Sequence, residues 1–315
     1  MNASRSAGER RDRDLPAVRP PEAREARFAL LLLLPALSLV AAVALLPILW
    51  TFWDSLHLYD LRLPWLGRPI IGADNYLEAL RDARFHSALG HTVLFVAVTV
   101  SLELLLGLGL ALALERVARA RGLLRTTVLL PWAIPTVVAA LVWRFMFDSP
   151  AGLVTTTLEA SGLSAPTWFA DPVAAWVPLM AADVWKSTPF VAILLVAGLQ
   201  QIDGALYEAA RVDGARAWRQ FADITLPLLR PALFVAFLFR TLDAFRVFDV
   251  IYVMTGGGPG SATEPIALYT FSTLLQHLRF GYGSALSMLV FAAAFLFALV
   301  CIRLFGGDAF ADRQP

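Results

Sequence analysis

Lysine is almost absent from this sequence, since Lys186 is the only one among 315 residues. A Walker A loop needs the order Gly-Lys-Ser/Thr, but Trp185 precedes Lys186 here. The chain therefore cannot hold a nucleotide in a loop of that kind, and hydrolysis of ATP by this chain is excluded.

Cysteine is equally scarce. The single Cys301 excludes an internal disulfide and a cysteine-based metal cluster, and its place in an apolar run is typical of a small hydrophobic side chain. The four histidines form no metalloprotease-type pair, and no serine stands in a nucleophile-elbow pattern. We therefore predict no catalytic residue, no cofactor site and no metal site in this chain.

Charge is also low, at 16% of residues, whereas hydrophobic residues make up 58% and the mean hydropathy is +0.65. A soluble globule of this composition would lack polar residues to cover its surface, so the bilayer is the expected solvent. The net charge of +1 argues against nucleic acid as a partner. One span takes about 20 helical residues, which leaves room for about six spans.

Six apolar runs indicate an all-α membrane protein. They lie at about 28–50, 87–114, 126–147, 173–199, 228–255 and 284–305. The first run has no charge and exceeds the roughly 7 to 15 residues of a signal-peptide core, so it predicts an uncleaved helix. The polar residues 1–27 predict a disordered tail, and residues 306–315 predict a short C-terminal tail around a transmembrane domain of residues 28–305.

The distribution of arginine predicts the orientation. Sixteen arginines lie in the N-terminal tail, the second and fourth connections and the C-terminal end, against five in the other three connections. Cytoplasmic segments retain positive charge. Both termini and the connection at about 200–227 are therefore expected in the cytoplasm, with the loops near 51–86, 148–172 and 256–283 outside.

The fourth connection reads QQIDGALYEAARVDGARAWRQFADITLPLLRPAL. Asp203 is placed to cap a short helix, and Gly214 is placed to end that helix in a left-handed conformation. A second short helix is expected around Trp218, before Leu226-Pro227 opens the next span. The residues predict a helix-turn-helix at the membrane surface, where small Ala209 and Ala210 admit a close partner and Glu208 and Arg211 offer polar contacts.

The spacing in this loop resembles a known signature. Glu208-Ala209-Ala210, three residues, Gly214, nine residues, Ile224 and then Leu226-Pro227 are similar to the coupling loop of binding-protein-dependent ABC importer permeases. LVWRFMFDSPAGLV, DVWKSTPFVAILLVAGLQQI and FRTLDAFRVFDVIYVMTGGGPGSAT extend the resemblance over about residues 28–305, to carbohydrate permeases of the maltose and trehalose type. Two departures, Thr155 for the usual Asn and Asp203 for the usual Pro, lie outside the coupling signature.

The resemblance implies a type I ABC importer permease fold in a bacterial plasma membrane, with extensive contact with membrane lipid. It implies that Glu208, Ala209, Ala210 and Gly214, together with Arg211 and Asp213, dock into a partner ATPase and transmit its closure. The implied partners are a second homologous permease, two copies of the ATPase, which bind the ATP and Mg, and an extracytoplasmic sugar-binding protein or lipoprotein. A di- or oligosaccharide of the trehalose or maltose type, or a glycerol phosphate, is the expected solute.

Several charges fall inside the predicted spans. Asp183 and Lys186 in the fourth span are three residues apart and can pair on one face of a helix. Arg240, Asp243, Arg246 and Asp249 alternate in sign along the fifth span and cannot all face lipid. Structural ion pairing between helices is the favoured interpretation for these residues, and for Glu103 in the second span. The alternative is a sugar pathway, whose candidate residues are Asp183, Trp185, Lys186, Arg240, Asp243 and Tyr252.

Two other classes of protein remain as alternatives. An ion-coupled secondary transporter would use the intramembrane charges as coupling sites, but it predicts an inverted repeat that the sequence does not show. A membrane-embedded enzyme would use the carboxylates for acid-base chemistry, but the chain lacks a nucleophile, a metal set and a nucleotide site.

Overall fold

The computed structural model describes residues 23–116, 121–148 and 150–311 of the chain. Within these ranges the protein contains helices and no β-strand, which confirms the predicted all-α class. Contacts divide the chain between Thr51 and Phe52 into an N-terminal unit and a main unit.

The N-terminal unit is one continuous apolar helix. It consists of α1 (Ala23–Val40), the π-helical segment η1 (Ala41–Leu45) and the first part of α2 (Leu46–Ser55). The helix begins at Ala23, earlier than the predicted Phe28. Pro35 and Pro47 lie inside the helical stretch, which continues through both. The predicted tail at 1–27 lies mostly outside the described residues.

The main unit contains all the other helices. They are η2 (Pro64–Leu66), α3 (Asp74–Arg81), α4 (Ala83–Arg116), α5 (Arg121–Ala133), α6 (Thr136–Phe147), α7 (Leu153–Ala160), α8 (Trp176–Leu199), α9 (Gly204–Val212), α10 (Ala217–Gln220), η3 (Phe221–Thr225), α11 (Leu226–Ala244), α12 (Asp249–Met254), α13 (Ile266–Phe271), η4 (Ser272–Gln276) and α14 (Phe280–Ala311).

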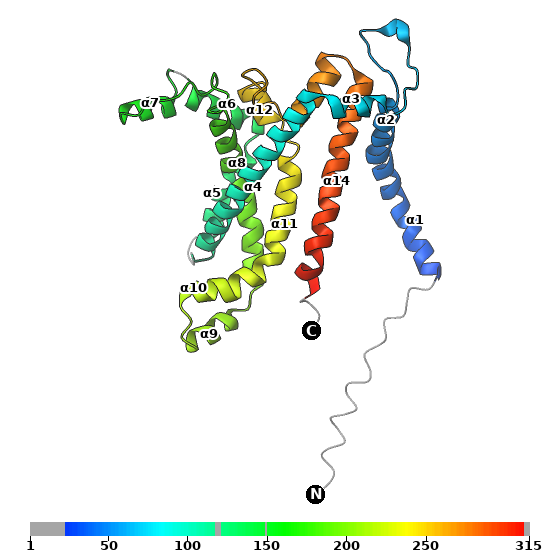
Figure 1. The fold of residues 1–315 in the computed structure, drawn as a ribbon. Coiled ribbons are helices and arrows are strands. Elements are labelled where there is room, and N and C mark those ends of the chain that lie inside the picture. The colour runs from blue at the N-terminus through cyan, green and yellow to red at the C-terminus, as the bar shows by residue number, and fades with distance from the viewer. Residues whose placement is uncertain (1–22, 117–120, 149, 312–315) are drawn as a thin grey trace. The chain divides into compact units, whose positions relative to one another are not determined.

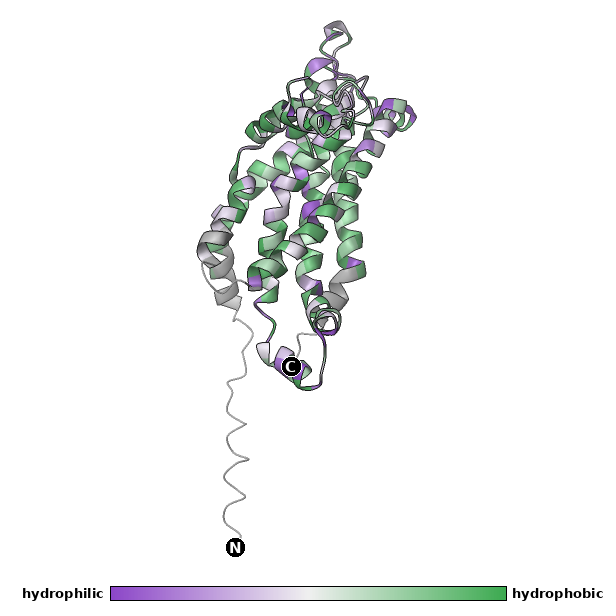
Figure 2. Cartoon of the chain, turned by 90° about the vertical axis from the view of Figure 1, so that its left-hand side faces the viewer, coloured by the Kyte–Doolittle hydropathy of each residue, from purple (hydrophilic) through white to green (hydrophobic). Residues whose placement is uncertain are grey.

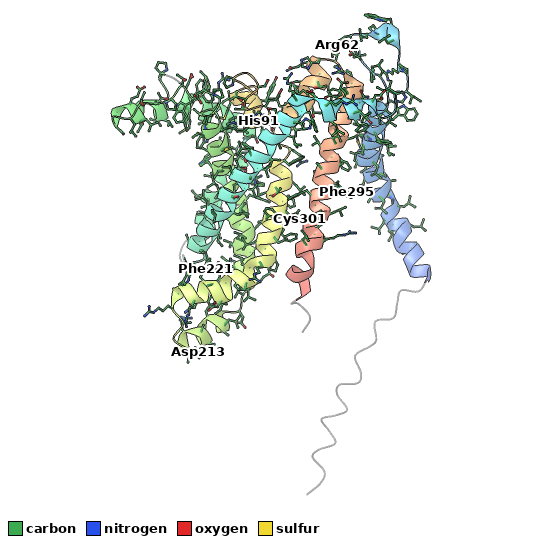
Figure 3. All side chains as sticks on the ribbon, viewed as in Figure 1. Arg62, His91, Asp213, Phe221, Phe295 and Cys301 are labelled. Atoms are coloured by element: carbon green, nitrogen blue, oxygen red, sulfur yellow. The ribbon has the colours of Figure 1, made fainter. Side chains whose placement is uncertain are left out.

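The long helices of the main unit run between two polar ends (Figures 1 and 2). Helices α9 and α10 lie at one end, the α9 end, where α14 also ends, whereas α3 and α7 lie at the opposite end together with the orange segment that holds α13 (Figure 1). Asp213 and Arg62 mark these two ends in Figure 3. The three loops predicted to share one side of the membrane, near 51–86, 148–172 and 256–283, contain α3, α7 and α13 and therefore lie at the same end. Helix α14 continues to Ala311, beyond the predicted end of the last span at 305.

The number of spans agrees with the prediction once one bent pair is counted as a single span. Five of the described helices are long and apolar enough to cross a bilayer, and the sixth span is the pair Thr126–Ala133 and Thr136–Phe147, which is bent by 89°. A continuous third helix at 126–147 was therefore wrong. Pro135 stands at the break and has no N–H to continue the helical hydrogen bonds.

The fifth span is shorter than the prediction of 228–255. Helix α11 ends at Ala244, and α12 begins at Asp249 after a turn. The apolar residues Val250, Ile251 and Met254 are not a continuation of α11, because they are buried in a core cluster with α6 and α8. The sequence had placed Arg246 in the fifth span, but this residue lies in the turn between α11 and α12.

Helices α4 and α8 share the most extensive packing in the main unit. A Cβ atom on Gly107 would approach Cγ1 of Val191 to 2.6 Å, so only glycine allows these two backbones to come so near. Ala111, Leu195 and Leu229 continue the buried seam toward α11. This seam brings Glu103, Asp183 and Arg240 into one cluster, which is described below.

A hydrogen-bonded carboxylate stabilises the end of the main unit that carries α3. The hydroxyls of Tyr269 and Tyr282 both donate to Oδ2 of Asp82. Burial by itself would raise the pKa of Asp82, but these hydroxyls and the amides of Arg84 and Phe85 outweigh it and hold the pKa below the usual range. A carboxyl with a lowered pKa stabilises the fold above its ordinary pKa of about 3.9 and loses that contribution as the pH falls through the lowered value.

We expect Asp82→Asn to reduce the loss of stability below about pH 4, since the variant has no proton to take up. The measurement is the unfolding temperature of the purified protein between pH 7 and pH 3. Glu159→Gln, on the exposed face of α7, is the matched control and should keep the wild-type pH profile. Equal pH profiles for Asp82→Asn and the wild type would contradict the assignment.

Candidate functional site

The connection between α8 and α11 forms the predicted helix-turn-helix. Oδ1 of Asp203 accepts a hydrogen bond of 2.9 Å from the amide of Ala205, which confirms Asp203 as the N-cap of α9. Gly214 has φ of +75°, and the amide of Ala215 donates to the carbonyl of Ala210 at 2.8 Å. These features confirm the predicted left-handed stop at Gly214, where any other residue would be strained.

Two polar contacts hold the loop in shape and tie it to the next span. The hydroxyl of Tyr207 on α9 lies 2.9 Å from Oγ1 of Thr225, a buried residue just before α11. The amide side chain of Gln220 donates to the carbonyl of Ala215 at 2.9 Å. Sequence analysis missed the pair of Tyr207 and Thr225, because residues 18 apart show no contact in a linear pattern.

The loop presents an exposed surface to a partner. Glu208, Ala209, Arg211 and Asp213 are exposed and Ala210 is half-buried. Large apolar side chains are exposed beside them, namely Leu206, Val212 and Trp218, the last two at 87% and 74%. Exposed apolar groups interleaved with charges are typical of a protein-binding surface.

Inside the membrane-spanning region, Arg240 lies at the centre of an ion cluster. Its Nε donates to Oε2 of Glu103 at 2.6 Å, and its Nη2 donates to Oε1 at 2.9 Å. The two side chains are 4% and 0% exposed. This two-pronged contact between α11 and α4 confirms that Glu103 pairs with a neighbouring helix.

Two further carboxylates complete the cluster. Oδ2 of Asp183 on α8 lies 3.3 Å from Nη2 of Arg240, and Nη1 of Arg240 donates to Asp243. Asp243 also lies 3.6 Å from Nη2 of Arg246. Three carboxylates thus surround one guanidinium, and the burial of Arg240 favours ion pairing over contact with a solute for this residue.

Other candidates for the sugar pathway are accessible. The side chain of Asp243 is 57% exposed, and Trp185 and Tyr252 are 40% and 46% exposed. Trp185 lies 5.9 Å from the ring of Trp143, and Tyr252 stacks on Phe248 at 5.2 Å. These aromatic faces and the carboxylate suit hydrogen bonding and stacking with a sugar.

Lys186 forms no direct ion pair with Asp183, although their spacing allows one, and Asp183 contacts Arg240. The ammonium instead donates to the carbonyls of Trp132 at 3.0 Å and Ile134 at 2.5 Å, at the break between α5 and α6. Carbonyls at a helix end lack helical partners and attract a cation. Pro135 interrupts the helix and leaves these carbonyls without helical donors, and Lys186 on the neighbouring helix α8 donates to them.

We expect Lys186→Met to lower the stability of the protein by about 1–3 kcal/mol, because it removes the charged donor to two carbonyls at the helix break, of which that of Ile134 is half-buried. Thermal unfolding of the purified protein measures this effect. Lys186→Arg should retain most of the stability, and Arg246→Met, at a side chain 73% exposed, is the control for loss of a cation. Equal unfolding temperatures for Lys186→Met and Arg246→Met would contradict the role.

The described residues contain no group of three or more His, Cys, Asp or Glu side chains placed to hold a metal ion. The charged side chains of the ion cluster around Arg240 pair with one another. The features left for interaction with other molecules are the exposed loop and the accessible aromatic and carboxylate groups.

Comparison with known proteins gives consistent results. Residues 103–313 match the family described as binding-protein-dependent transport system inner membrane component. The chain is 44% identical to the trehalose/maltose transport system permease protein MalF of Thermococcus litoralis, over 89% of this chain and 94% of that protein. It is 41% identical to the trehalose transport system permease protein SugA of Mycobacterium tuberculosis, over 90% and 91%.

A third relative is the sulfoquinovosyl glycerol transport system permease protein SmoG of Agrobacterium fabrum, 37% identical over 88% of this chain and 89% of that protein. Among solved structures, a chain of a bacterial ABC transporter involved in the import of the acidic polysaccharide alginate aligns with a TM-score of 0.76. It is 24% identical and covers 89% of this chain and 96% of its own. This likeness confirms the predicted permease fold.

The match over residues 103–313 and the identity to the permeases across nearly the whole chain agree with the apolar spans and the loop at α9 and α10. The chain is therefore a multi-pass inner membrane protein that belongs to the family of inner membrane components of binding-protein-dependent transport systems.

Proposed function

We propose that this chain is the permease subunit of an ATP-driven importer of a di- or oligosaccharide of the trehalose or maltose type. The observation that carries the proposal is the exposed helix-turn-helix of α9 and α10, which holds the signature Glu208-Ala209-Ala210 and Gly214. The named functions of the relatives support the choice of solute. A glycerol phosphate is the second candidate, and the name of the sulfoquinovosyl glycerol permease adds a glycoside of glycerol.

The proposed assembly contains a second homologous permease, two ATPase subunits and an extracytoplasmic sugar-binding protein or lipoprotein. The accessible groups Trp185, Asp243 and Tyr252 would form one half of a pathway that the second permease completes. ATP and Mg would be bound by the ATPase subunits, so this chain would need no cofactor. Both termini and the α9 end would face the cytoplasm, in line with the distribution of arginine.

The closing movement of the ATPase subunits would pass from the loop to the spans through the contact of Tyr207 with Thr225. Closure of the ATPase subunits displaces α9, and the hydrogen bond of 2.9 Å carries this displacement to the start of α11. Helix α11 also bears Arg240, which joins α4 and α8 through Glu103 and Asp183. A displacement of α9 would thus reach α11, α4 and α8 together. An alternating-access mechanism needs such a joint movement of the spans.

The test is ATP hydrolysis by the complete transporter, reconstituted with its companion permease, ATPase and binding protein and supplied with a panel of sugars. One sugar from the trehalose and maltose group should stimulate hydrolysis and enter the vesicles. Uptake that follows an ion gradient, without stimulation of hydrolysis by any sugar, would instead identify an ion-coupled secondary transporter.

A further inference from the structure

The connection between α2 and α3, residues 56–73, carries an exposed apolar surface. In both views it projects beyond the other elements at its end of the main unit, along the direction of the spans (Figures 1 and 2). Four large apolar side chains, which we call the apolar tip, are exposed here, namely Leu61 at 45%, Trp65 at 75%, Leu66 at 48% and Ile70 at 70%. Single exposed apolar residues are ordinary, but four of them in one projecting loop indicate a surface that another molecule covers.

The base of the connection is held by contacts with α3 and with the start of α14. The buried side chain of Asn75 on α3 donates to the carbonyls of Ser55 and His57 at 2.8 and 3.0 Å. A Cβ atom on Gly281 would meet the carbonyl oxygen of His57 at 2.2 Å, so α14 begins directly against the connection. A loop with a fixed base loses little conformational freedom when a partner binds, which favours binding.

Two arginines lie close to Trp65 in the connection. Arg62 donates through Nε and Nη2 to the carboxylate of Asp60 at 2.9 and 2.6 Å, and its side chain is 49% exposed. The guanidinium of Arg68 lies 3.5 Å from the centre of the Tyr59 ring. Tryptophan and arginine are enriched among the residues that contribute most to protein interfaces. The composition of the connection therefore favours a protein as its partner.

We propose that the apolar tip is a docking surface for the extracytoplasmic sugar-binding protein. This inference rests on the proposed function, which supplies that partner and places this end of the chain outside the cell. The family to which the chain belongs transports with the help of a binding protein. Such a protein meets the membrane components from outside the bilayer, and a loop that projects from the outer end is within its reach.

Two other occupants fit the position of the apolar tip less well. Lipid would cover the tip only if the connection lay in the membrane, but it projects beyond α3, whose exposed Asp74, Glu78 and Arg81 require water or lipid headgroups. The second permease of the proposed assembly would pack beside the spans, whereas the connection projects along their direction.

The first test measures the concentration of sugar-loaded binding protein that gives half-maximal stimulation of ATP hydrolysis by the complete transporter in lipid nanodiscs. Trp65→Ala should raise this concentration about tenfold or more, as expected for loss of a central tryptophan from an interface. The maximal rate of hydrolysis and the unfolding temperature should stay unchanged, because Trp65 is 75% exposed. Trp50→Ala is the matched control, since Trp50 is 66% exposed but lies inside the first span, and it should keep the wild-type concentration.

The second test identifies the partner directly. The photoreactive residue p-benzoylphenylalanine, in place of Trp65, should crosslink to the sugar-loaded binding protein on irradiation of the assembled transporter. A crosslink to lipid or to the companion permease instead would overturn the inference, and so would equal half-maximal concentrations for Trp65→Ala and the wild type. If no loaded binding protein stimulates the wild-type transporter, the proposed function itself fails, and the inference fails with it.

Discussion

Arg240→Met is expected to destabilise the protein by about 3–5 kcal/mol, the usual cost of breaking a buried ion pair by removing one partner. Glu103 is fully buried, and both of its oxygens accept from Arg240. Without the guanidinium, its charge has no partner and no access to water. Asp183 and Asp243 would lose their cation as well, but they are 17% and 57% exposed and would retain contact with solvent. The measurement is thermal or denaturant-induced unfolding of the purified protein in detergent.

The double variant Glu103→Gln with Arg240→Met separates burial of a charge from loss of packing. Removing both charges should recover a large part of the stability, because the largest penalty comes from the orphaned carboxylate. Arg246→Met is the matched control, since Arg246 contacts the same Asp243 but is 73% exposed, and exposed pairs contribute at most about 1 kcal/mol. Equal losses for Arg240→Met and Arg246→Met would show that the cluster is not a structural centre.

The sequence predicted the spans and the loop well, because both depend on local patterns. Apolar runs located the long helices, and Asp203 and Gly214 located the start and the end of α9 to the residue. Capping chemistry acts between neighbours in the chain, so it can be recognised without knowledge of the fold.

Contacts between distant residues could not be predicted in the same way. Lys186 and Asp183 have a spacing that suits a pair on one helix face, yet Lys186 contacts carbonyls more than fifty residues away in sequence. The signal for this contact was Pro135, whose missing N–H breaks the span and exposes carbonyls. The identity of the donor depended on the packing of α8 against α5.

The end of α11 illustrates a second limit. No glycine or proline marks the stop at Ala244, and the apolar run continues to Met254. The helix ends there because Val250, Ile251 and Met254 pack into a core formed by other helices. Tertiary packing therefore overrides the local pattern, and placement of the pathway candidates Asp243 and Tyr252 on separate helices followed only from the structure.

The loop between α8 and α11 has two separable requirements, a fixed shape and an exposed surface. Asp203, Gly214 and the contact of Tyr207 with Thr225 fix the shape. Glu208 has no part in these contacts and points its charge from an exposed position on α9. If the proposed ATPase docks on this surface, a change at Glu208 should affect its binding without affecting the fold.

Glu208→Arg is expected to reduce the affinity of the transporter for its proposed ATPase subunits by more than about tenfold, since the reversal removes the carboxylate from the docking surface and places a longer side chain of opposite charge there. Co-purification of the ATPase with the permeases and sugar-stimulated ATP hydrolysis should both fall. The unfolding temperature of the permease should stay unchanged. Glu159→Arg, the same charge reversal on exposed α7 at the opposite end, should leave both measurements at the wild-type level. If Glu208→Arg retains the ATPase and its hydrolysis is still stimulated by sugar, the docking contact lies elsewhere. If the variant retains the ATPase but loses the stimulation, Glu208 acts in transmission of closure, because the subunits still bind but no longer move α9.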